Sequence, residues 1–196
     1  MVRILLLLLG GVFLFSCNRT NLKYDKPYTD FDSLINIQVQ ELLHARITIN
    51  KKSVINGKKD STSFVPDSLK LANELDIFRQ IDLINKPLYL RAYEIKEGEK
   101  DTKSNLMIRS YTTKLPSPVP VIKFYFTPSG RELKKIETVF HEENTLYSTK
   151  RNLILEFDDS NGSRLLSGYH VNGVQKMILS DSVNFSVDVS FSSGKH

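Results

Sequence analysis

Apolar and polar side chains alternate without a break in the stretch Val183-Asn184-Phe185-Ser186-Val187-Asp188-Val189-Ser190-Phe191. Successive side chains of a β-strand point to opposite faces, so the apolar residues of this stretch share one face and the polar residues the other. An apolar face of this kind has to be covered by another layer of the protein. The stretch therefore predicts a half-buried strand in a sheet with one dry face and one wet face.

The same period of two runs from Leu88 to this strand and is interrupted by turn residues. Proline and glycine in Thr127-Pro128-Ser129-Gly130 suit a tight turn, and Asn172-Gly173 is a pair favoured in two-residue hairpin turns. The pattern is typical of antiparallel strands joined in chain order. The predicted strands are 88–96, 104–114, 120–127, 131–141, 145–157, 164–171, 174–180 and 183–191.

Two amphipathic helices and one hairpin are predicted before these strands. Thr29 can cap the first helix, whose apolar residues recur largely at spacings of three, four and seven. Asn56-Gly57 is a second favoured hairpin pair, and Pro87 stops the second helix. The predicted elements of this part are a helix over about 30–47, strands over 47–55 and 58–64, and a helix over about 66–84.

One apolar sheet face and two amphipathic helices together predict an α+β fold. We expect a curved antiparallel meander sheet packed on one or both N-terminal helices, within a single domain over residues 29–196. This arrangement resembles the curved sheet-and-helix domains of periplasmic lipoprotein carriers. The resemblance concerns the fold class alone, because no local motif extends it to chemistry.

Composition and charge exclude several classes of protein. The 196 residues are 40% apolar and 25% charged, as in ordinary globular proteins. The formal net charge of +5 lies in short basic groups such as Lys51-Lys52, without the long basic stripe that binds phosphate backbones. Cys17 is the single cysteine, so neither an intramolecular disulfide nor a thiolate metal cluster can form. We therefore expect no nucleic-acid partner and no cofactor.

The first residues have the features of an export signal. Met1-Val2-Arg3 is a short positive start, and the run from Ile4 to Phe15 contains only apolar residues and glycine. A helix needs about 20 apolar residues to span a bilayer, so this shorter run has the length of a signal-peptide core. Residues 1–16 are therefore predicted to be a signal peptide.

The residues that end this run, Leu14-Phe15-Ser16-Cys17, resemble the lipobox of bacterial lipoproteins, in the form typical of the Bacteroidota. The resemblance implies that Cys17 is diacylated, becomes the first residue after cleavage and is then acylated again. Two or more acyl chains hold a protein stably in a bilayer. Residues 17–28 are polar and contain Pro27, so they would form a lipidated tether between the membrane and the domain.

The residues after the cysteine also bear on location. Bacteroidota lipoproteins bound for the cell surface resemble one another in an acidic cluster soon after the cysteine. The segment from Asn18 to Lys23 contains no acidic residue. The resemblance therefore implies a lipid anchor in the cell envelope, at the periplasmic face of the outer membrane.

Local motifs of catalysis and metal binding are absent from the sequence. His141-Glu142-Glu143 lacks the second histidine of a zinc-protease motif, because Thr145 stands at that position. The segment Asp158 to Gly162 lacks the alternate oxygen spacing of a calcium loop and favours a hairpin turn. We predict no catalytic residue and no metal site. Carboxylates on separate strands could still assemble into a pair, and the candidates are Glu94, Glu137, Glu156 and Asp188.

Apolar residues of the predicted inner sheet face have two possible roles. If the helices fill the concave side of the sheet, these side chains are core. If a gap remains, the same surface becomes an apolar ligand site. The candidate residues are Ile122, Phe124, Phe126, Leu153, Leu155, Phe157, Phe185 and Val187.

These observations favour a membrane-anchored, non-enzymatic lipoprotein that binds an envelope protein or an apolar ligand. An enzyme that acts on envelope polymers is an alternative, which would need two carboxylates within roughly 5 to 10 Å in a polar pocket. A structural spacer is the other alternative.

The substitution Cys17→Ala removes the sulfur that would carry the lipid. We expect this variant to incorporate no radiolabelled palmitate and to accumulate as soluble or unprocessed protein, while its domain stays folded. Metabolic labelling followed by immunoprecipitation measures the incorporation, with the unchanged chain as the positive control. Palmitate retained by the variant would contradict the lipoprotein assignment.

Overall fold

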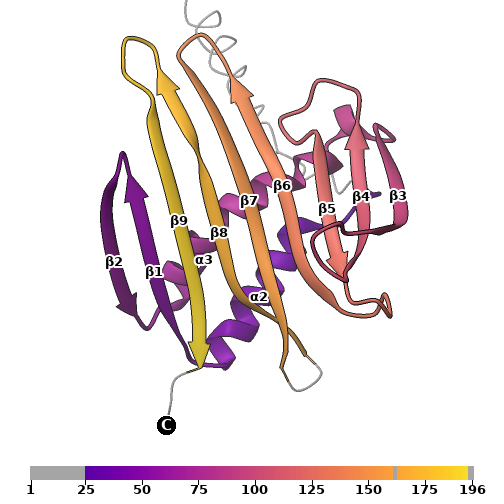
Figure 1. Ribbon diagram of the computed structural model, residues 1–196, viewed down its shortest axis with the longest axis horizontal. Coiled ribbons are helices and arrows are strands. Elements are labelled where there is room, and N and C mark those ends of the chain that lie inside the picture. Colours follow the sequence, from indigo (N-terminus) through magenta and orange to yellow (C-terminus); the bar gives the residue numbers. More distant parts are fainter. Residues whose placement is uncertain (1–24, 161–162, 194–196) are drawn as a thin grey trace, which may run out of the picture.

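The computed structural model describes residues 25–160 and 163–193, so the predicted signal peptide and Cys17 lie outside the described residues. Nine strands form one antiparallel sheet, and two α-helices lie against one of its faces (Figure 1). The helices are α2 (Phe31–His44) and α3 (Ser68–Arg79), followed by the 3₁₀ helices η2 (Gln80–Asn85) and η3 (Pro87–Tyr89). The strands are β1 (Ile47–Ile55), β2 (Lys58–Phe64), β3 (Tyr93–Lys100), β4 (Met107–Thr113), β5 (Val121–Phe126), β6 (Leu133–Glu143), β7 (Tyr147–Ser160), β8 (Ser163–Met177) and β9 (Val183–Ser193).

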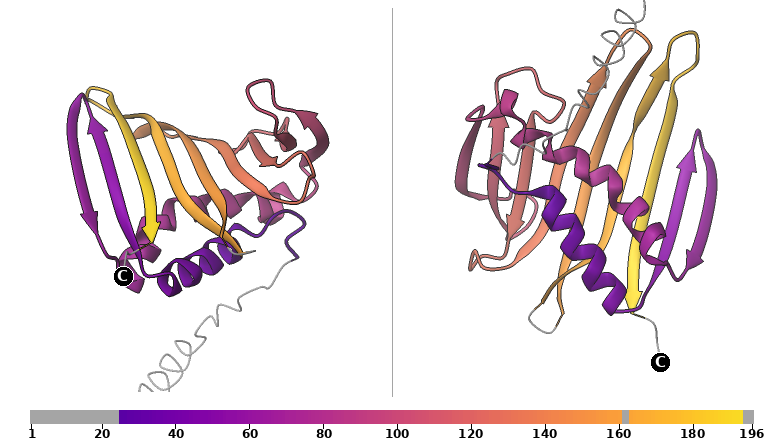
Figure 2. Two further views of the ribbon diagram at one scale, coloured as in Figure 1. Left: turned by 60° about the horizontal axis from the view of Figure 1, so that its bottom comes forward. Right: turned by 180° about the vertical axis from the view of Figure 1, so that it is seen from behind.

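The predicted α+β class with an antiparallel meander sheet is confirmed. The strand order is β2-β1-β9-β8-β7-β6-β5-β4-β3, so β3 to β9 pair in chain order and the β1–β2 hairpin joins them beside β9. The sheet is not closed, because β2 and β3 are its two edges. Figure 2 shows the sheet arching over α2 and α3, which lie together on its concave side.

Local sequence signals explain most of the element ends. The predicted turn at Asn56-Gly57 is confirmed, with φ values of 48° and 82° that this turn type requires. The first helix is capped one residue later than expected, because the carboxylate of Asp30, and not the hydroxyl of Thr29, accepts the backbone N–H of Ser33. Asp67 caps α3 in the same way, by accepting the N–H of Lys70 at 2.7 Å.

The expectation of a hairpin turn at Asn172-Gly173 is wrong. These residues lie in the middle of β8, which joins the predicted strands 164–171 and 174–180 into one. Asn172 pairs with Asn152 of β7 on one side and with Ser186 of β9 on the other. The long neighbouring strands therefore hold β8 extended, and this tertiary pairing outweighs the local turn preference.

The expectation of a strand over 88–96 is wrong at its start. Pro87 begins the short helix η3, and the strand starts at Tyr93. Pro87 suits the first position of a helical turn, and Tyr89 packs edge-on against Tyr93 with its side chain buried. The predicted second helix also changes type at its end, since α3 stops at Arg79 and continues as η2.

One hydrophobic core lies between the helices and the concave face of the sheet. Phe31 of α2 packs near Phe124, whose ring in turn lies 5.0 Å from that of Tyr111. Phe78 of α3 meets Tyr169 of β8 edge-on at 5.2 Å. The fully buried large side chains are Phe31, Phe78, Ile35, Leu42, Ile49, Leu71, Leu75, Ile81, Ile84, Ile122, Ile136 and Leu153. The core residues of the described segments all follow Asn18 in the sequence, so a chain that starts at Asn18 keeps them.

Two buried amide side chains fix α2 and η2 against their neighbours. Gln38 accepts the backbone N–H of Leu166 at 2.7 Å and donates to the carbonyl of Arg164. These two bonds satisfy backbone groups of β8 close to the register shift at Glu156 of β7. Asn85 accepts the N–H of Tyr28 and donates to the carbonyl of Thr29. These bonds set the position of the helices under the sheet.

No helix among the described residues is both long and apolar enough to cross a membrane.

The substitution Phe124→Ala tests the core. Phe124 is 4% exposed and contacts α2 and β4, so we expect a loss of about 3–5 kcal/mol in the free energy of unfolding. Ile37→Ala is the matched control, because Ile37 is 56% exposed on α2 and should change stability by no more than about 0.5 kcal/mol. Urea denaturation measures both, and equal losses would place Phe124 outside the core.

Candidate functional site

The helices cover only part of the concave face. β7 is 14 residues long, so it extends for about 46 Å at 3.3 Å per residue. Two helices side by side, each about 10 Å wide, cover roughly 20 Å of that length. Figure 2 shows the upper ends of β6, β7, β8 and β9 extending past α3. The concave face is therefore partly open along one side of α3.

The structure divides the candidate face residues into two groups. Five are core side chains under the helices: Ile122, Phe124, Leu153, Leu155 and Phe157. The other three are half-buried and pack against the core from its margin: Phe126, Phe185 and Val187. Phe185 and Val187 line a cleft between α3 and the sheet, whereas Phe126 lies on β5 away from it. The eight residues predicted to form either core or a ligand face thus divide into five core residues and three at its margin.

A first cleft lies between η2 and strands β6 to β8. Its volume is about 560 Å³. Its floor is Phe140, and its sides carry polar groups from the sheet and cationic and amide groups from the helix. The lining residues are Gln80, Leu83, Lys86, Pro118, Phe140, Glu142, Tyr147, Thr149, Arg151 and Gln175.

Arg151 is the central charged group of this cleft. Its guanidinium lies 4.5 Å from the centre of the Phe140 ring, and Nη2 donates to Oε1 of Gln80 at 3.0 Å. Nε is buried and has no hydrogen-bond partner among the described residues. Burial lowers the pKa of Arg151, but a guanidinium remains protonated at neutral pH. The cleft is thus lined by a fixed positive charge.

A second cleft of about 220 Å³ lies between α3 and strands β1, β8 and β9. Phe185, Val187 and Ile77 provide its apolar lining. A polar network closes one end, where Glu74 of α3 pairs with Lys51 at 2.6 Å and accepts the hydroxyl of Tyr169. Burial, followed by this hydrogen bond to Glu74, raises the pKa of Tyr169, so the hydroxyl stays protonated at neutral pH.

The two clefts follow the same side of α3. Asn73, Ile77 and Gln80 line them and stand at spacings of four and three, which places them on one helix face. On the sheet, Arg151 of the first cleft and Phe185 of the second lie in one cross-strand row, on either side of Gly173. We call the two clefts together the helix-edge groove.

Gly173 is required in that row by a close approach of the backbone. A Cβ atom at this position would lie 2.3 Å from the carbonyl oxygen of Lys150 and 3.0 Å from Cα of Arg151. No larger residue fits without a backbone shift.

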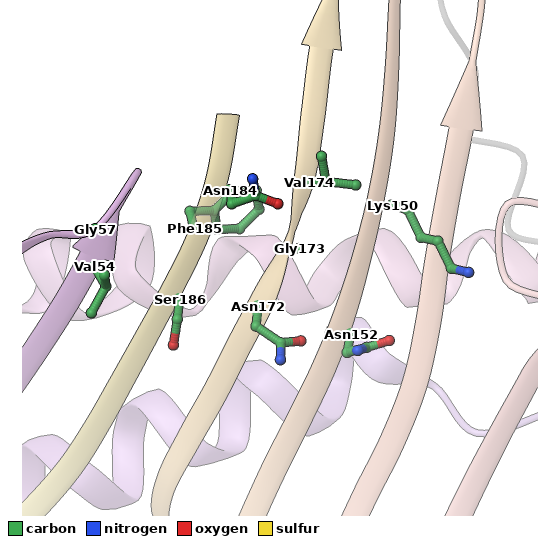
Figure 3. Close-up of a pocket in the computed structure, with 10 residues that line it drawn as sticks. All are labelled: Val54, Gly57, Lys150, Asn152, Asn172, Gly173, Val174, Asn184, Phe185 and Ser186. Atoms are coloured by element: carbon green, nitrogen blue, oxygen red, sulfur yellow. The ribbon is translucent and has the colours of Figure 1, made fainter. Parts of the chain in front are cut away.

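The outer face of the sheet carries a separate polar depression of about 480 Å³. Figure 3 shows the amides of Asn152 and Asn172 side by side on it, with Ser186 and Val54 on the next two strands. Oδ1 of Asn172 is buried and has no hydrogen-bond partner within the part of the chain that the structure describes. The depression is wide and open, so it encloses a ligand less well than the groove.

The four carboxylates considered as candidates for a catalytic pair all occupy strand positions that face outward from the sheet. Two of them have structural partners. Glu137 accepts the hydroxyl of Tyr125 at 2.8 Å, and Asp188 pairs with His170. His141 is 3.8 Å from Glu143 at an exposed strand end. Glu94 and Glu156 are exposed.

A different carboxylate group meets beside the first helix. Asp30, Asp32 and Asp82 have oxygens within 4.8 Å of one another. The ammonium of Lys26 lies among them, at 2.7, 3.1 and 2.7 Å from Asp30, Asp32 and Asp82 respectively. Burial alone would lower the pKa of Lys26, but these hydrogen bonds outweigh it and raise that pKa. A lysine thus already occupies the centre of the cluster. Lys26 and Tyr28 belong to the segment expected to be tether, yet both pack on the domain.

Sequence reasoning missed the charged residues of the helix-edge groove, although a signal for them was present. Arg151 precedes the buried residues Leu153 and Leu155 of β7 by two and four positions, so it belongs to the same inward-facing set of the strand. Lys51 has the same parity as Ile49 in β1. A charged residue among the inward-facing apolar residues of a strand indicates a place where the core ends. Gln80 and Lys86 come from helical segments, and the strand pattern gives no signal for them.

The comparisons with known proteins find no matching family model, no significantly similar curated protein and no significantly similar solved structure.

The substitution Lys26→Met tests the acidic cluster. Removal of the ammonium leaves three carboxylates together, with Asp82 only 8% exposed, so we expect a loss of about 1–3 kcal/mol at pH 7. Burial raises the pKa of Asp30, but the bonds from Lys26 and Ser33 outweigh it and lower that pKa. A lowered carboxylate pKa stabilises the fold above the unfolded pKa, and the effect is lost as the pH falls through the folded pKa.

The difference between the unchanged chain and Lys26→Met should therefore shrink as the pH falls below about 4. Urea denaturation at several pH values measures this difference. Lys70→Met is the control, since Lys70 forms an exposed pair with Asp67 at 3.7 Å and should have little effect. A loss for Lys26→Met that is independent of pH would contradict the electrostatic explanation.

Proposed function

We propose that the protein is a lipoprotein of the cell envelope, anchored by lipid on Cys17 at the periplasmic face of the outer membrane. In this proposal it acts as a non-enzymatic binding component, and its ligand occupies the helix-edge groove. The lipobox resemblance supports the anchor. The groove supports the binding role.

The observation that carries the binding role is the combination of groups in the groove. Apolar side chains, Phe185 and Val187, line one cleft, and the positively charged Arg151 lines the other. A hydrogen bond to a charged group contributes about 1.5–3 kcal/mol, so Arg151 favours a ligand that carries a negative charge. The cleft volumes of about 560 and 220 Å³ suit a small molecule or an extended chain.

These groups define a class of ligand. Arg151 and Lys86 favour a carboxylate or phosphate, and the margin of the core favours an apolar chain. The ligand we propose is therefore an amphiphile with an anionic head, such as a fatty acid. Its head would lie at Arg151 and its chain along α3 towards Phe185.

The alternative of an enzyme on envelope polymers has less support. Its requirement is a polar pocket with two carboxylates about 5 to 10 Å apart and accessible to substrate. Among the described residues, the group of three acidic side chains whose oxygens meet is the one held by Lys26, and Asp82 in that cluster is 8% exposed. Glu142 lines one cleft of the groove, where its hydrogen bond with Tyr147 raises the pKa of that tyrosine. Glu74 lines the other cleft, where it is held by Lys51 and Tyr169.

Titration with a fluorescent fatty acid, 11-(dansylamino)undecanoic acid, tests the ligand class on the chain that starts at Asn18. We expect saturable binding in the unchanged protein and weaker binding in Arg151→Met, which keeps an apolar stem over Phe140. A hydrogen bond to a charged group contributes about 1.5–3 kcal/mol, which corresponds to a roughly 10- to 150-fold increase in Kd.

Two controls make the result specific. The carboxyl group of the probe is uncharged in its methyl ester, so the unchanged protein should prefer the acid, and this preference should be smaller in Arg151→Met, which keeps Lys86. Arg109→Met removes another arginine on an aromatic ring, Phe126, that pairs with Glu97 outside the groove, and it should leave Kd unchanged. Absence of saturable binding at tens of micromolar probe would rule out the proposed site.

A further inference from the structure

Four exposed apolar side chains gather at one end of the sheet. Leu146 lies in the β6–β7 loop, and Met177, Ile178 and Leu179 lie where β8 leads into the β8–β9 loop. Their exposed fractions are 64, 54, 56 and 100%. The two loops are neighbours at the top of Figure 1, and the N–H of Ile178 donates to the carbonyl of Leu146 at 2.8 Å. We call these four residues the apolar tip.

The backbone of the apolar tip is organised to present these side chains. The carboxamide oxygen of Asn144 accepts the N–H groups of Leu146 and Tyr147, and the N–H of Ser180 donates to the carbonyl of Met177. Leu179 has a φ of 62°, a left-handed conformation that is uncommon for a bulky residue. Strain of this kind often marks a functional surface. The core gains nothing from it, because Leu179 is fully exposed.

We propose that the apolar tip inserts into the surface of the bilayer to which the protein is anchored, an inference that rests on the proposed lipid at Cys17. Paired backbone groups lower the energy needed to bring a loop out of water. Tyr147 and Lys176 flank the tip, and both side chain types place an apolar body in lipid and a polar end at the headgroups. Asp181 balances the charge of Lys176, so a bilayer of zwitterionic lipid is sufficient.

The length of the tether permits this contact. Tyr28, near the start of the described chain, packs on Tyr111, whose cross-strand row continues to Leu153 of β7. Leu153 is six positions along β7 from Tyr147 at the tip, which is about 20 Å of strand. Eight residues lead from Cys17 to Asp25, and they can span up to about 28 Å. The lipid and the apolar tip can therefore reach the same membrane surface.

Fluorescence of a single introduced tryptophan tests the insertion, because the chain has no tryptophan of its own. The lipidated mature protein with Leu179→Trp is reconstituted at low density in phosphatidylcholine and phosphatidylethanolamine vesicles. We expect a blue-shifted emission and strong quenching by lipids brominated on their acyl chains. Leu69→Trp is the matched control, since Leu69 is 71% exposed in the first turn of α3, far from the tip, and should be neither shifted nor quenched.

A second substitution, Ile178→Asp in the Leu179→Trp protein, should reduce the quenching at least threefold. The same substitution should leave the Kd of the fatty-acid probe unchanged, so a failure here is distinguishable from a failure of the groove proposal. Equal quenching of Trp at positions 179 and 69 overturns the inference. A blue shift that depends on protein density and not on brominated lipid also overturns it, because the occupant is then a second copy of the chain. Absence of lipid on Cys17 also overturns the inference, because the lipid anchor is its premise.

Discussion

The structure depends on the need to cover one apolar face of an open sheet. A closed barrel would satisfy its own edges and fill its own interior, but here the strands stop at β2 and β3, and two helices supply the missing layer. The helices are narrow relative to the length of β7 and β8, so full cover is not possible with two of them. The same geometry that creates the core therefore also creates the margin at which Arg151 and Phe185 stand.

The period-two pattern was sufficient to predict the fold class, the meander and the inward residues of β5 and β7, because alternation along a strand is set by backbone geometry alone. The turn preference of Asn172-Gly173 gave a wrong prediction, because pairing with strands from elsewhere in the chain outweighs it. The period-two pattern also did not locate the groove. Which part of an apolar face stays open depends on where α3 crosses the strands, and that is a property of tertiary packing.

Polar residues inside the fold have a common role at the places where elements meet. Gln38 joins α2 to β8, Asn85 joins η2 to the entering chain, and Lys26 joins that chain to Asp82. Each satisfies groups that would otherwise be buried without partners, so each restricts how the helices can sit under the sheet.

The two edges of the sheet differ from its interior in their side chains. Almost every side chain of β2 is exposed and β3 is rich in charge, which discourages pairing with other chains.

The position of the β1–β2 hairpin has a consequence for how the chain folds. Ile47 pairs with Ser193 and Ile55 with Phe185, so strands from the two ends of the domain become neighbours. Contacts over such sequence distances form late and make folding slow, because a long loop must close before the pairing stabilises it. A chain that emerges from a translocation channel with its N-terminus first would have to wait for its last strand. During that interval β1 and β8 both expose an unpaired edge, so this domain should depend strongly on chaperones that bind exposed strands.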